Sequence, residues 1–403
     1  MASRQPLRRR ELIQWGAAAA LGVATGPLRA QAAPVRVGLT AELKMVNSTS
    51  DDAVRLGLAL AIEDLNAAGG VLGGRPWQLE VRDDRSVPSR GTDNLRELAG
   101  LPDLVAVFGS RFSPVTVEMG ALAPQVQCPV ISPWAASNSV IDPKQSPGWV
   151  FRVSLNDTWA MRRLLRTAQA DGHSRLGFLL PNSGWGRSCH DAALAQAQGM
   201  KGMALLPEHW YNWGGEKTLI EHVALLKQAG MQALILVANE PEGSVLCKEM
   251  LALPANARVP VYSHWGIAGG DFPSLVGPGL QALDLKVVQT TALQIDRTPR
   301  GRHLLQRAAQ RMGVAPPNRL PSLVGLGQAY DAMGLVHRAV QQAGSTQRAA
   351  VRDALEHLPP FDGVVRRYAP AFTPQRHEAF SEADVILAHW DDTGALRALP
   401  TRG

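Results

Sequence analysis

Short apolar runs alternate with amphipathic stretches along most of the chain beyond residue 33. The runs are nearly continuous in apolar character, which is typical of strands that are buried on both faces of a parallel sheet. We predict strands over residues 35–39, 79–81, 104–108, 129–131, 176–180, 233–237 and 259–262.

Helical periodicity fills the segments between these strands. In residues 51–68, Val54, Leu58, Ala61 and Leu65 recur at a helical spacing, and a glycine pair then ends the pattern. Ser113-Pro114 indicates an N-cap followed by an N1 proline. Further helices are predicted over residues 92–98, 186–197, 216–229, 242–251, 303–312 and 324–343.

Strands that alternate with helices predict an α/β fold with parallel sheets covered on both faces. Two such series along the chain predict two doubly wound parallel-sheet lobes. Residues 361–366 and 384–390 differ in character and indicate a few antiparallel strands. Ligands bind beyond the C-terminal strand ends of such sheets, so two facing lobes would form a cleft there.

The first 32 residues have the three parts of a signal peptide. Arg8-Arg9-Arg10 is basic, residues 12–25 are mostly apolar, and Ala30-Gln31-Ala32 is a small-x-small cleavage site. We therefore predict export to the periplasm, with a basic arm on a cytoplasmic protein as the alternative. The arginine pair resembles a twin-arginine (Tat) signal, although Arg8 stands where Ser or Thr is usual, so the general secretory route remains open. No later stretch is apolar enough to span a bilayer, and the mature protein is expected to be soluble.

Charge and cysteine content exclude several other classes. Of the net charge of +6, residues 1–32 carry +4, which leaves about +2 for the remaining residues and no argument for nucleic acid. The three cysteines, Cys128, Cys189 and Cys247, fit neither a zinc site nor a Cys-x-x-Cys motif. We expect them to be buried core residues.

The segment over residues 59–74 is similar to the first helix and turn of the leucine/isoleucine/valine-binding proteins, which are type I periplasmic solute-binding proteins. Four later landmarks fall in the order that this family requires: Asp83-Asp84, residues 107–113, residues 130–133 and Gly184-Trp185-Gly186. The resemblance covers essentially the whole chain beyond the signal. It implies two lobes joined by a three-crossing hinge, with residues 33–153 plus 290–360 in lobe 1 and 154–289 plus 361–403 in lobe 2. It also implies closure of the lobes around a ligand.

The function that this resemblance implies is capture of a small ligand for the membrane permease of an ABC transporter, with no cofactor, no metal and no catalysis. Family members hold the ligand carboxylate with a serine at the position of Ser113. A helix N-terminus there would attract an anion in any case, while the alternative role is a simple N-cap. Further contacts are implied for the turn after Pro133 and for an aromatic lid at Trp185, whose alternative role is packing. The turn residues are Trp134, Ala135, Ala136 and Ser137.

Departures from the family pattern suggest a ligand other than leucine. Trp265 stands where amino acid binders have an acidic residue, and Asn239 stands where they have an aromatic one. Glu240 or Glu242 is the candidate substitute for the missing carboxylate, and His264 is a pocket-wall or surface histidine. Three tryptophans (134, 185 and 265) would suit an aromatic acid, an amide or another planar solute. A family disulfide is expected to be absent, because its positions correspond to Ser86 and Phe112.

Two other functions remain to be weighed. Ser188, Cys189 and His190 are a nucleophile-like group, but neighbours on a helix point away from one another, and no hydrolase or P-loop motif is present. An enzyme is therefore disfavoured. A periplasmic ligand-sensing partner of a membrane receptor or kinase would need the same cleft and remains the alternative.

Overall fold

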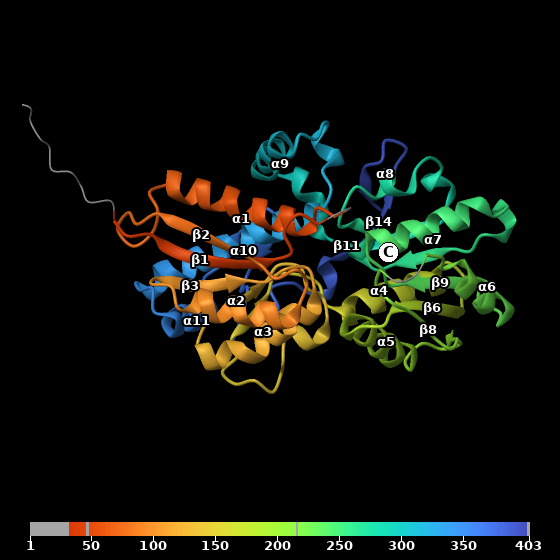
Figure 1. Ribbon diagram of the computed structural model, residues 1–403, viewed down its shortest axis with the longest axis horizontal. Coiled ribbons are helices and arrows are strands. Elements are labelled where there is room, and N and C mark those ends of the chain that lie inside the picture. Colours follow the sequence, from red (N-terminus) through yellow and green to blue (C-terminus); the bar gives the residue numbers. More distant parts are fainter. Residues whose placement is uncertain (1–31, 46–47, 215–216, 401–403) are drawn as a thin grey trace, which may run out of the picture. The chain divides into compact units, whose positions relative to one another are not determined.

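The computed structural model describes residues 32–45, 48–214 and 217–400 (Figure 1). The predicted signal peptide therefore lies outside the described residues, except for Ala32. Within the described part, no helix combines the length and apolar character needed to cross a membrane.

The first lobe is built on a five-stranded parallel sheet with the order β2-β1-β3-β4-β5. Its central strand β3 is buried along its whole length, as its apolar run predicts. The strands are β1 (Val35–Ala41), β2 (Trp77–Asp83), β3 (Leu104–Phe108), β4 (Val130–Ser132) and β5 (Val150–Arg152).

Helices cover both faces of this sheet (Figure 1). Val105 of β3 belongs to a core cluster shared with α1 and α10, whereas Val107 belongs to one shared with α2 and α3. Successive strand side chains point to opposite faces, so two separate cores are expected. The helices are α1 (Ser50–Ala67), α2 (Pro88–Ala99), α3 (Ser113–Val126), α10 (Leu323–Ala343) and α11 (Arg348–Leu355).

The second lobe has a larger sheet with the order β15-β14-β11-β10-β9-β6-β7, and β8 also pairs with β6. Six of its strands are parallel: β6 (Arg175–Pro181), β7 (Ala204–Leu205), β8 (His209–Tyr211), β9 (Ala233–Leu236), β10 (Val261–Ser263) and β11 (Leu285–Thr290). Strands β14 (Val385–Trp390) and β15 (Leu396–Ala398) are antiparallel, as the tail predicts.

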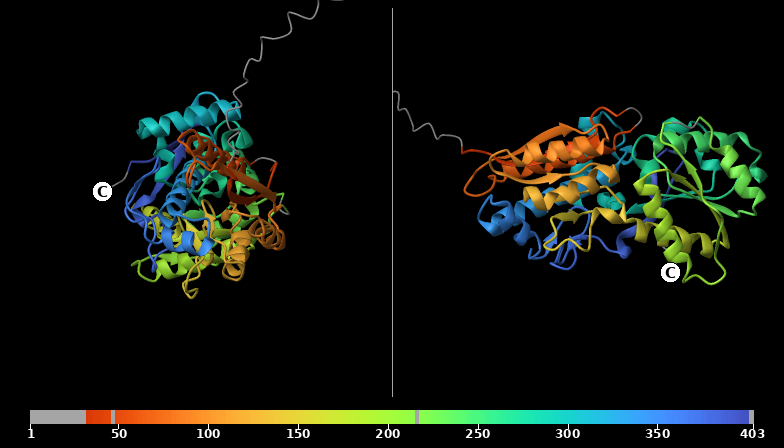
Figure 2. Two further views of the ribbon diagram at one scale, coloured as in Figure 1. Left: turned by 90° about the vertical axis from the view of Figure 1, so that its left-hand side faces the viewer. Right: turned by 60° about the horizontal axis from the view of Figure 1, so that its bottom comes forward.

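Helices also lie on both faces of the second sheet (Figure 2). Ile235 packs with residues of α4 and α5, and Leu236 packs with residues of α6 and α7. The helices are α4 (Asp157–Ala170), α5 (Gly184–Ala197), α6 (Ile220–Gln228), α7 (Glu240–Ala252) and the short α8 (Phe272–Val276), while α9 (Pro299–Met312) follows the return to lobe 1.

The chain passes between the sheets three times: from β5 to α4, from β11 towards α9, and from the C-terminal segment into β14. These crossings, the parallel first sheet and the mainly parallel second sheet confirm the predicted fold class. The hairpin of β12 (Phe361–Asp362) and β13 (Arg367–Tyr368) is antiparallel and lies beside α10, where Asp331 accepts the Val364 and Val365 N–H groups. Part of the tail assigned to lobe 2 thus contacts lobe 1, and the assignment of residues to lobes remains a proposal.

Several predicted element ends differ from the structure, and two of these differences have a clear physical cause. Helix α3 begins at Ser113 itself, with Phe112 as its N-cap, and Ser113 makes no capping hydrogen bond. Its hydroxyl instead accepts the Ser137 N–H at 3.1 Å, because the turn after β4 lies against it. The strand predicted from residue 259 begins at Val261, since Pro260 has no N–H for the ladder.

The three cysteines are free and buried, as predicted. Burial raises the thiol pKa of Cys128 and of Cys247 to about 12, so both thiols stay protonated at neutral pH. These properties are those of small core residues and not of reactive thiols.

A buried arginine ties the C-terminal segment to the first sheet. Arg152 at the end of β5 is only 1% exposed and donates from Nε to Glu378 at 2.8 Å and from Nη1 to the Ser137 carbonyl at 2.7 Å. Its Nη2 also pairs with Glu378, which makes the contact bidentate. Removing one partner of such a pair leaves a buried charge without compensation.

We predict that Glu378→Ala lowers the free energy of unfolding by about 3 kcal/mol, because Arg152 loses its counter-charge. Urea denaturation measures the change. Glu382→Ala is the matched control: it removes the carboxylate that pairs with Arg162, both side chains of that pair are about one third exposed, and the expected loss is below about 1 kcal/mol. Equal losses in the two variants would contradict the assignment.

Two buried carboxyl groups lie beside the C-terminal end of β1. Asp51 in the first turn of α1 accepts the Glu42 and Arg111 N–H groups, and Asp84 accepts a hydrogen bond from Thr40. Desolvation raises the pKa of Asp51 to about 7 and the pKa of Asp84 to about 6, against the lowering effect of these hydrogen bonds.

The raised pKa of Asp51 makes stability depend on pH. Between about pH 4 and pH 7 the folded chain binds more protons at Asp51 than the unfolded chain does, so stability falls as pH rises through this window. We predict that Asp51→Asn makes the fall in melting temperature between pH 4.5 and 7.5 less steep. Asp52→Asn, at the more exposed neighbouring position, serves as control and should keep the slope of the unsubstituted protein. An unchanged slope in Asp51→Asn would refute the prediction.

Candidate functional site

A pocket lies where the C-terminal strand ends of the two sheets meet. Every residue in its wall follows the C-terminal end of a strand, which is the usual ligand position in parallel sheets. The empty space between the wall residues is about 330 Å³, and this figure includes the part open to solvent. The wall consists of Arg111, Phe112, Ser113, Trp134 and Ala136 from lobe 1, and Trp185, Trp213, Asn239, Trp265 and Gly266 from lobe 2.

Four tryptophans dominate this wall. Trp134 of lobe 1 and Trp265 of lobe 2 face each other with ring centroids 5.5 Å apart and planes inclined by 43°. Trp185 and Trp213 lie 6.5 Å apart, inclined by 30°. Aromatic pairs at these distances attract one another and present flat apolar surface to a ligand.

The position of Trp134 depends on a glycine in a distant helix. A Cβ atom at Gly325 of α10 would lie 2.4 Å from Cζ3 of Trp134, closer than side-chain atoms approach one another. The indole therefore packs directly on the α10 backbone, which holds it at the pocket.

Six of the ten residues predicted for the site line this pocket: Ser113, Trp134, Ala136, Trp185, Asn239 and Trp265. The other four, Ala135, Ser137, Glu240 and His264, lie behind the wall and are buried. A ligand contact for any of the ten remains a prediction.

Four wall residues were not predicted. Arg111 and Phe112 directly precede Ser113 and follow β3, so their place in the turn was the available signal. Trp213 lies in an irregular segment after β8, and no pattern in the sequence marks it. Gly266 follows Trp265, and only the structure shows it in the wall.

A buried ion pair joins the lobes at one edge of the pocket. Nη1 of Arg111 lies 2.8 Å from both carboxylate oxygens of Glu240, the first residue of α7, and 2.9 Å from the Ser48 hydroxyl. The side chains of Arg111 and Glu240 are 6% and 0% exposed. Gly269 makes room for the pair, since a Cβ there would lie 2.1 Å from Glu240 Oε1. Glu240 thus already has a counter-charge within the protein.

Further hydrogen bonds hold the lobes together directly. The Gly269 carbonyl of lobe 2 accepts the Thr49 N–H at 2.9 Å and the Ser322 hydroxyl at 2.7 Å, both from lobe 1. On α5, the Ser188 hydroxyl accepts the Asn138 N–H at 2.9 Å. The structure therefore has the two lobes in contact around the pocket.

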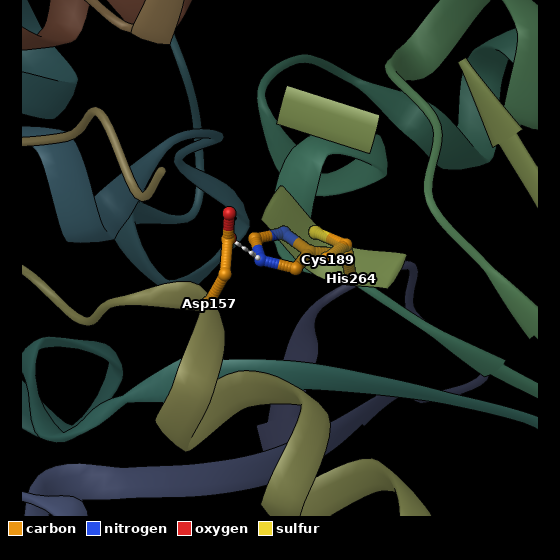
Figure 3. A group of neighbouring side chains, drawn as sticks. All are labelled: Asp157, Cys189 and His264. Atoms are coloured by element: carbon orange, nitrogen blue, oxygen red, sulfur yellow. Dashed lines mark hydrogen bonds and ion pairs between the residues drawn. The ribbon is translucent and has the colours of Figure 1, made fainter. Parts of the chain in front are cut away.

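Asp157, Cys189 and His264 form a buried group of neighbouring side chains (Figure 3). The three ligand atoms lie within 4.8 Å of one another, as in a metal site. His264 Nδ1 accepts the Trp265 N–H at 3.0 Å, so the proton of a neutral ring is on Nε2, which lies 3.1 Å from Asp157 Oδ1.

The same carboxylate oxygen accepts the Trp185 Nε1–H at 3.3 Å. Burial, with Asp157 nearby, raises the thiol pKa of Cys189 well above its usual value, so the thiol stays protonated. These protonation states favour a hydrogen-bonded group that orients Trp185, and they leave His264 Nε2 no free lone pair for a metal.

The neighbours Ser188, Cys189 and His190 do not act together. Ser188 bonds to Asn138 of lobe 1, Cys189 lies beside Asp157, and the His190 ring packs against Trp210. Successive side chains on a helix point in different directions, so these three residues do not form a pair of nucleophile and general base.

The chain was compared with known protein families and structures. The family described as "Periplasmic binding protein" matches residues 34–395. No curated protein matches the chain.

Solved structures share the fold at low sequence identity. The chain is similar to a type 1 periplasmic binding protein from Bordetella pertussis (22% identity, TM-score 0.79, covering 91% of this chain and 100% of that one). It is also similar to a fatty acid ABC transporter substrate-binding protein from Thermomonospora curvata (16% identity, TM-score 0.74, covering 91% of this chain and 91% of that one). A third similar structure is the branched-chain amino acid transporter substrate-binding protein LivJ from Streptococcus pneumoniae in complex with isoleucine (15% identity, TM-score 0.72, covering 91% of this chain and 99% of that one). With the family match spanning nearly all of the chain beyond residue 33, the protein belongs to the periplasmic binding protein family.

Proposed function

We propose that this protein is exported and captures a small ligand in the interlobe pocket for delivery to the permease of an ABC transporter. The ligand class is an amino acid, an amide or an aromatic acid. Export rests on the signal-like residues 1–32, and the twin-arginine route stays a prediction.

The observation that carries the proposal is the pocket itself. Its wall draws five residues from each lobe, so a ligand held there would contact both and favour their closed arrangement. Apolar rings with a few polar groups are the usual composition of a small-molecule site.

The neighbours support the transport role and leave the ligand open. One is a fatty acid ABC transporter substrate-binding protein, and another is a branched-chain amino acid transporter substrate-binding protein in complex with isoleucine. The same fold thus serves different ligands, and the residues of the pocket have to select among them.

The indole-lined wall favours planar ligands over branched aliphatic ones. Trp134, Trp185, Trp213 and Trp265 offer ring faces. The family resemblance also implies that Trp265 stands where amino acid binders have an acidic residue. An ammonium group transferred from water to this wall would lose hydration without a carboxylate in contact.

We predict that aromatic carboxylates and amides raise the melting temperature more than leucine does. A ligand at 100 times its dissociation constant stabilises the folded state by about 2.7 kcal/mol, which is a shift of several degrees. A thermal-shift screen of amino acids, amides and aromatic acids measures it. A screen in which no compound shifts the transition would count against the proposed function.

A pair of tryptophan variants tests the pocket. We predict that Trp213→Leu weakens binding of the best compound by about tenfold, because a stacking surface is lost. Trp210→Leu is the matched control: it is a partly buried tryptophan in the neighbouring strand β8 and lies outside the pocket wall. Isothermal titration calorimetry gives both affinities, and equal values would remove the pocket assignment.

A further inference from the structure

Arg111 is the charged residue of the pocket wall, and only part of its guanidinium makes hydrogen bonds within the protein. Its hydrogen bonds to described residues all leave from Nη1, towards Glu240 and Ser48. Nε is buried and has no acceptor in the described part of the chain. The edge formed by Nε and Nη2 therefore remains for another partner.

That edge has the geometry that a carboxylate recognises. Nε–H and Nη2–H are parallel donors in a rigid plane, and a carboxylate engages them with two parallel hydrogen bonds. The guanidinium is already fixed, because Glu240 holds Nη1 and the Phe112 ring lies 4.8 Å from its central carbon. A ligand acceptor would meet a preorganised donor pair and would restore a partner to the buried Nε–H.

Electrostatics around the pocket disfavours an amino group on the ligand. The wall contains no aspartate or glutamate among the described residues. Glu240 is fully buried, and its carboxylate is bound by Arg111 and Ser48. Turning it to a ligand ammonium would leave Arg111 buried without a counter-charge.

Two other buried carboxylates lie near the pocket but outside its wall: Asp157, and Glu242, whose Oε1 accepts the Gly214 N–H at 3.2 Å. Asp157 is buried behind Trp185, accepts hydrogen bonds through Oδ1, and has no partner for Oδ2 among the described residues. It is not part of the wall, and the Trp185 indole occupies the wall in front of it.

We infer that Arg111 is a specificity-determining residue: it binds the carboxylate of a planar ligand through Nε and Nη2, and the pocket selects planar monocarboxylates that lack an amino group. This inference rests on the proposed ligand-binding function and narrows it. The indoles hold the ring, and Arg111 holds the anionic end.

Calorimetric titration with matched probes tests the inference. Benzoate, cinnamate and indole-3-carboxylate are compared with benzamide, benzylamine and L-phenylalanine. At least one of the acids should bind at least about tenfold more tightly than the amide, since a hydrogen bond to a charged group contributes about 1.5–3 kcal/mol. Benzylamine and phenylalanine should show no measurable binding.

Arg111→Lys separates recognition from folding. Lysine keeps the charge opposite Glu240 but lacks the Nε and Nη2 edge, so the acid should bind about 10- to 100-fold more weakly while the melting temperature without ligand changes little. Arg187→Lys, an exposed arginine of α5 outside the pocket wall, is the control and should keep full affinity.

The outcomes distinguish the two proposals. Tighter binding of phenylalanine, benzylamine or an aliphatic amino acid than of every acid would overturn the role of Arg111 and leave the solute-binding function intact. Unchanged acid affinity in Arg111→Lys would overturn it as well. Absence of binding across these probes and the wider amino acid and amide panel would overturn both.

Discussion

The contact between the lobes beside the pocket depends on a buried charge pair. Arg111 and Glu240 come from opposite lobes and are almost completely excluded from water, and the Ser48 hydroxyl completes the network. Burying two charges is costly unless each is fully paired, so these residues have to meet where the lobes are in contact. The pair therefore fixes the geometry of the contact between the lobes.

This pair also determines what else the pocket can hold. Because Glu240 is committed to Arg111, the wall presents donors and aromatic rings but no free carboxylate in the described part of the chain. Behind the wall, Asp157 and His264 orient Trp185 through its indole N–H, and Gly325 lets Trp134 lie on α10. For the proposed function, rigid rings placed by a second layer of contacts would bind a planar ligand with little loss of conformational freedom.

Local patterns were sufficient for the architecture. The apolar run Leu104–Phe108 predicted a strand, and it is a buried strand of a sheet covered on both faces. The amphipathic pattern of α1 predicted a helix, and α1 covers one of those faces. Element ends were less predictable. Ser113 was predicted to cap a helix, yet its hydroxyl serves the turn at Ser137, because the tertiary contact outweighs the local capping preference.

The sequence by itself determined the alternation of strands and helices, the two lobes, the antiparallel tail and the buried cysteines, since all of these follow from periodicity and burial along the chain. Tertiary structure alone decided the pairing of Arg111 with Glu240, 129 residues away, and the arrival of Trp213 in the wall. Both depend on where separate loops meet across the two lobes. No local sequence pattern predicts which side chains pair between the lobes, because the distance between two such side chains depends on how the two sheets pack.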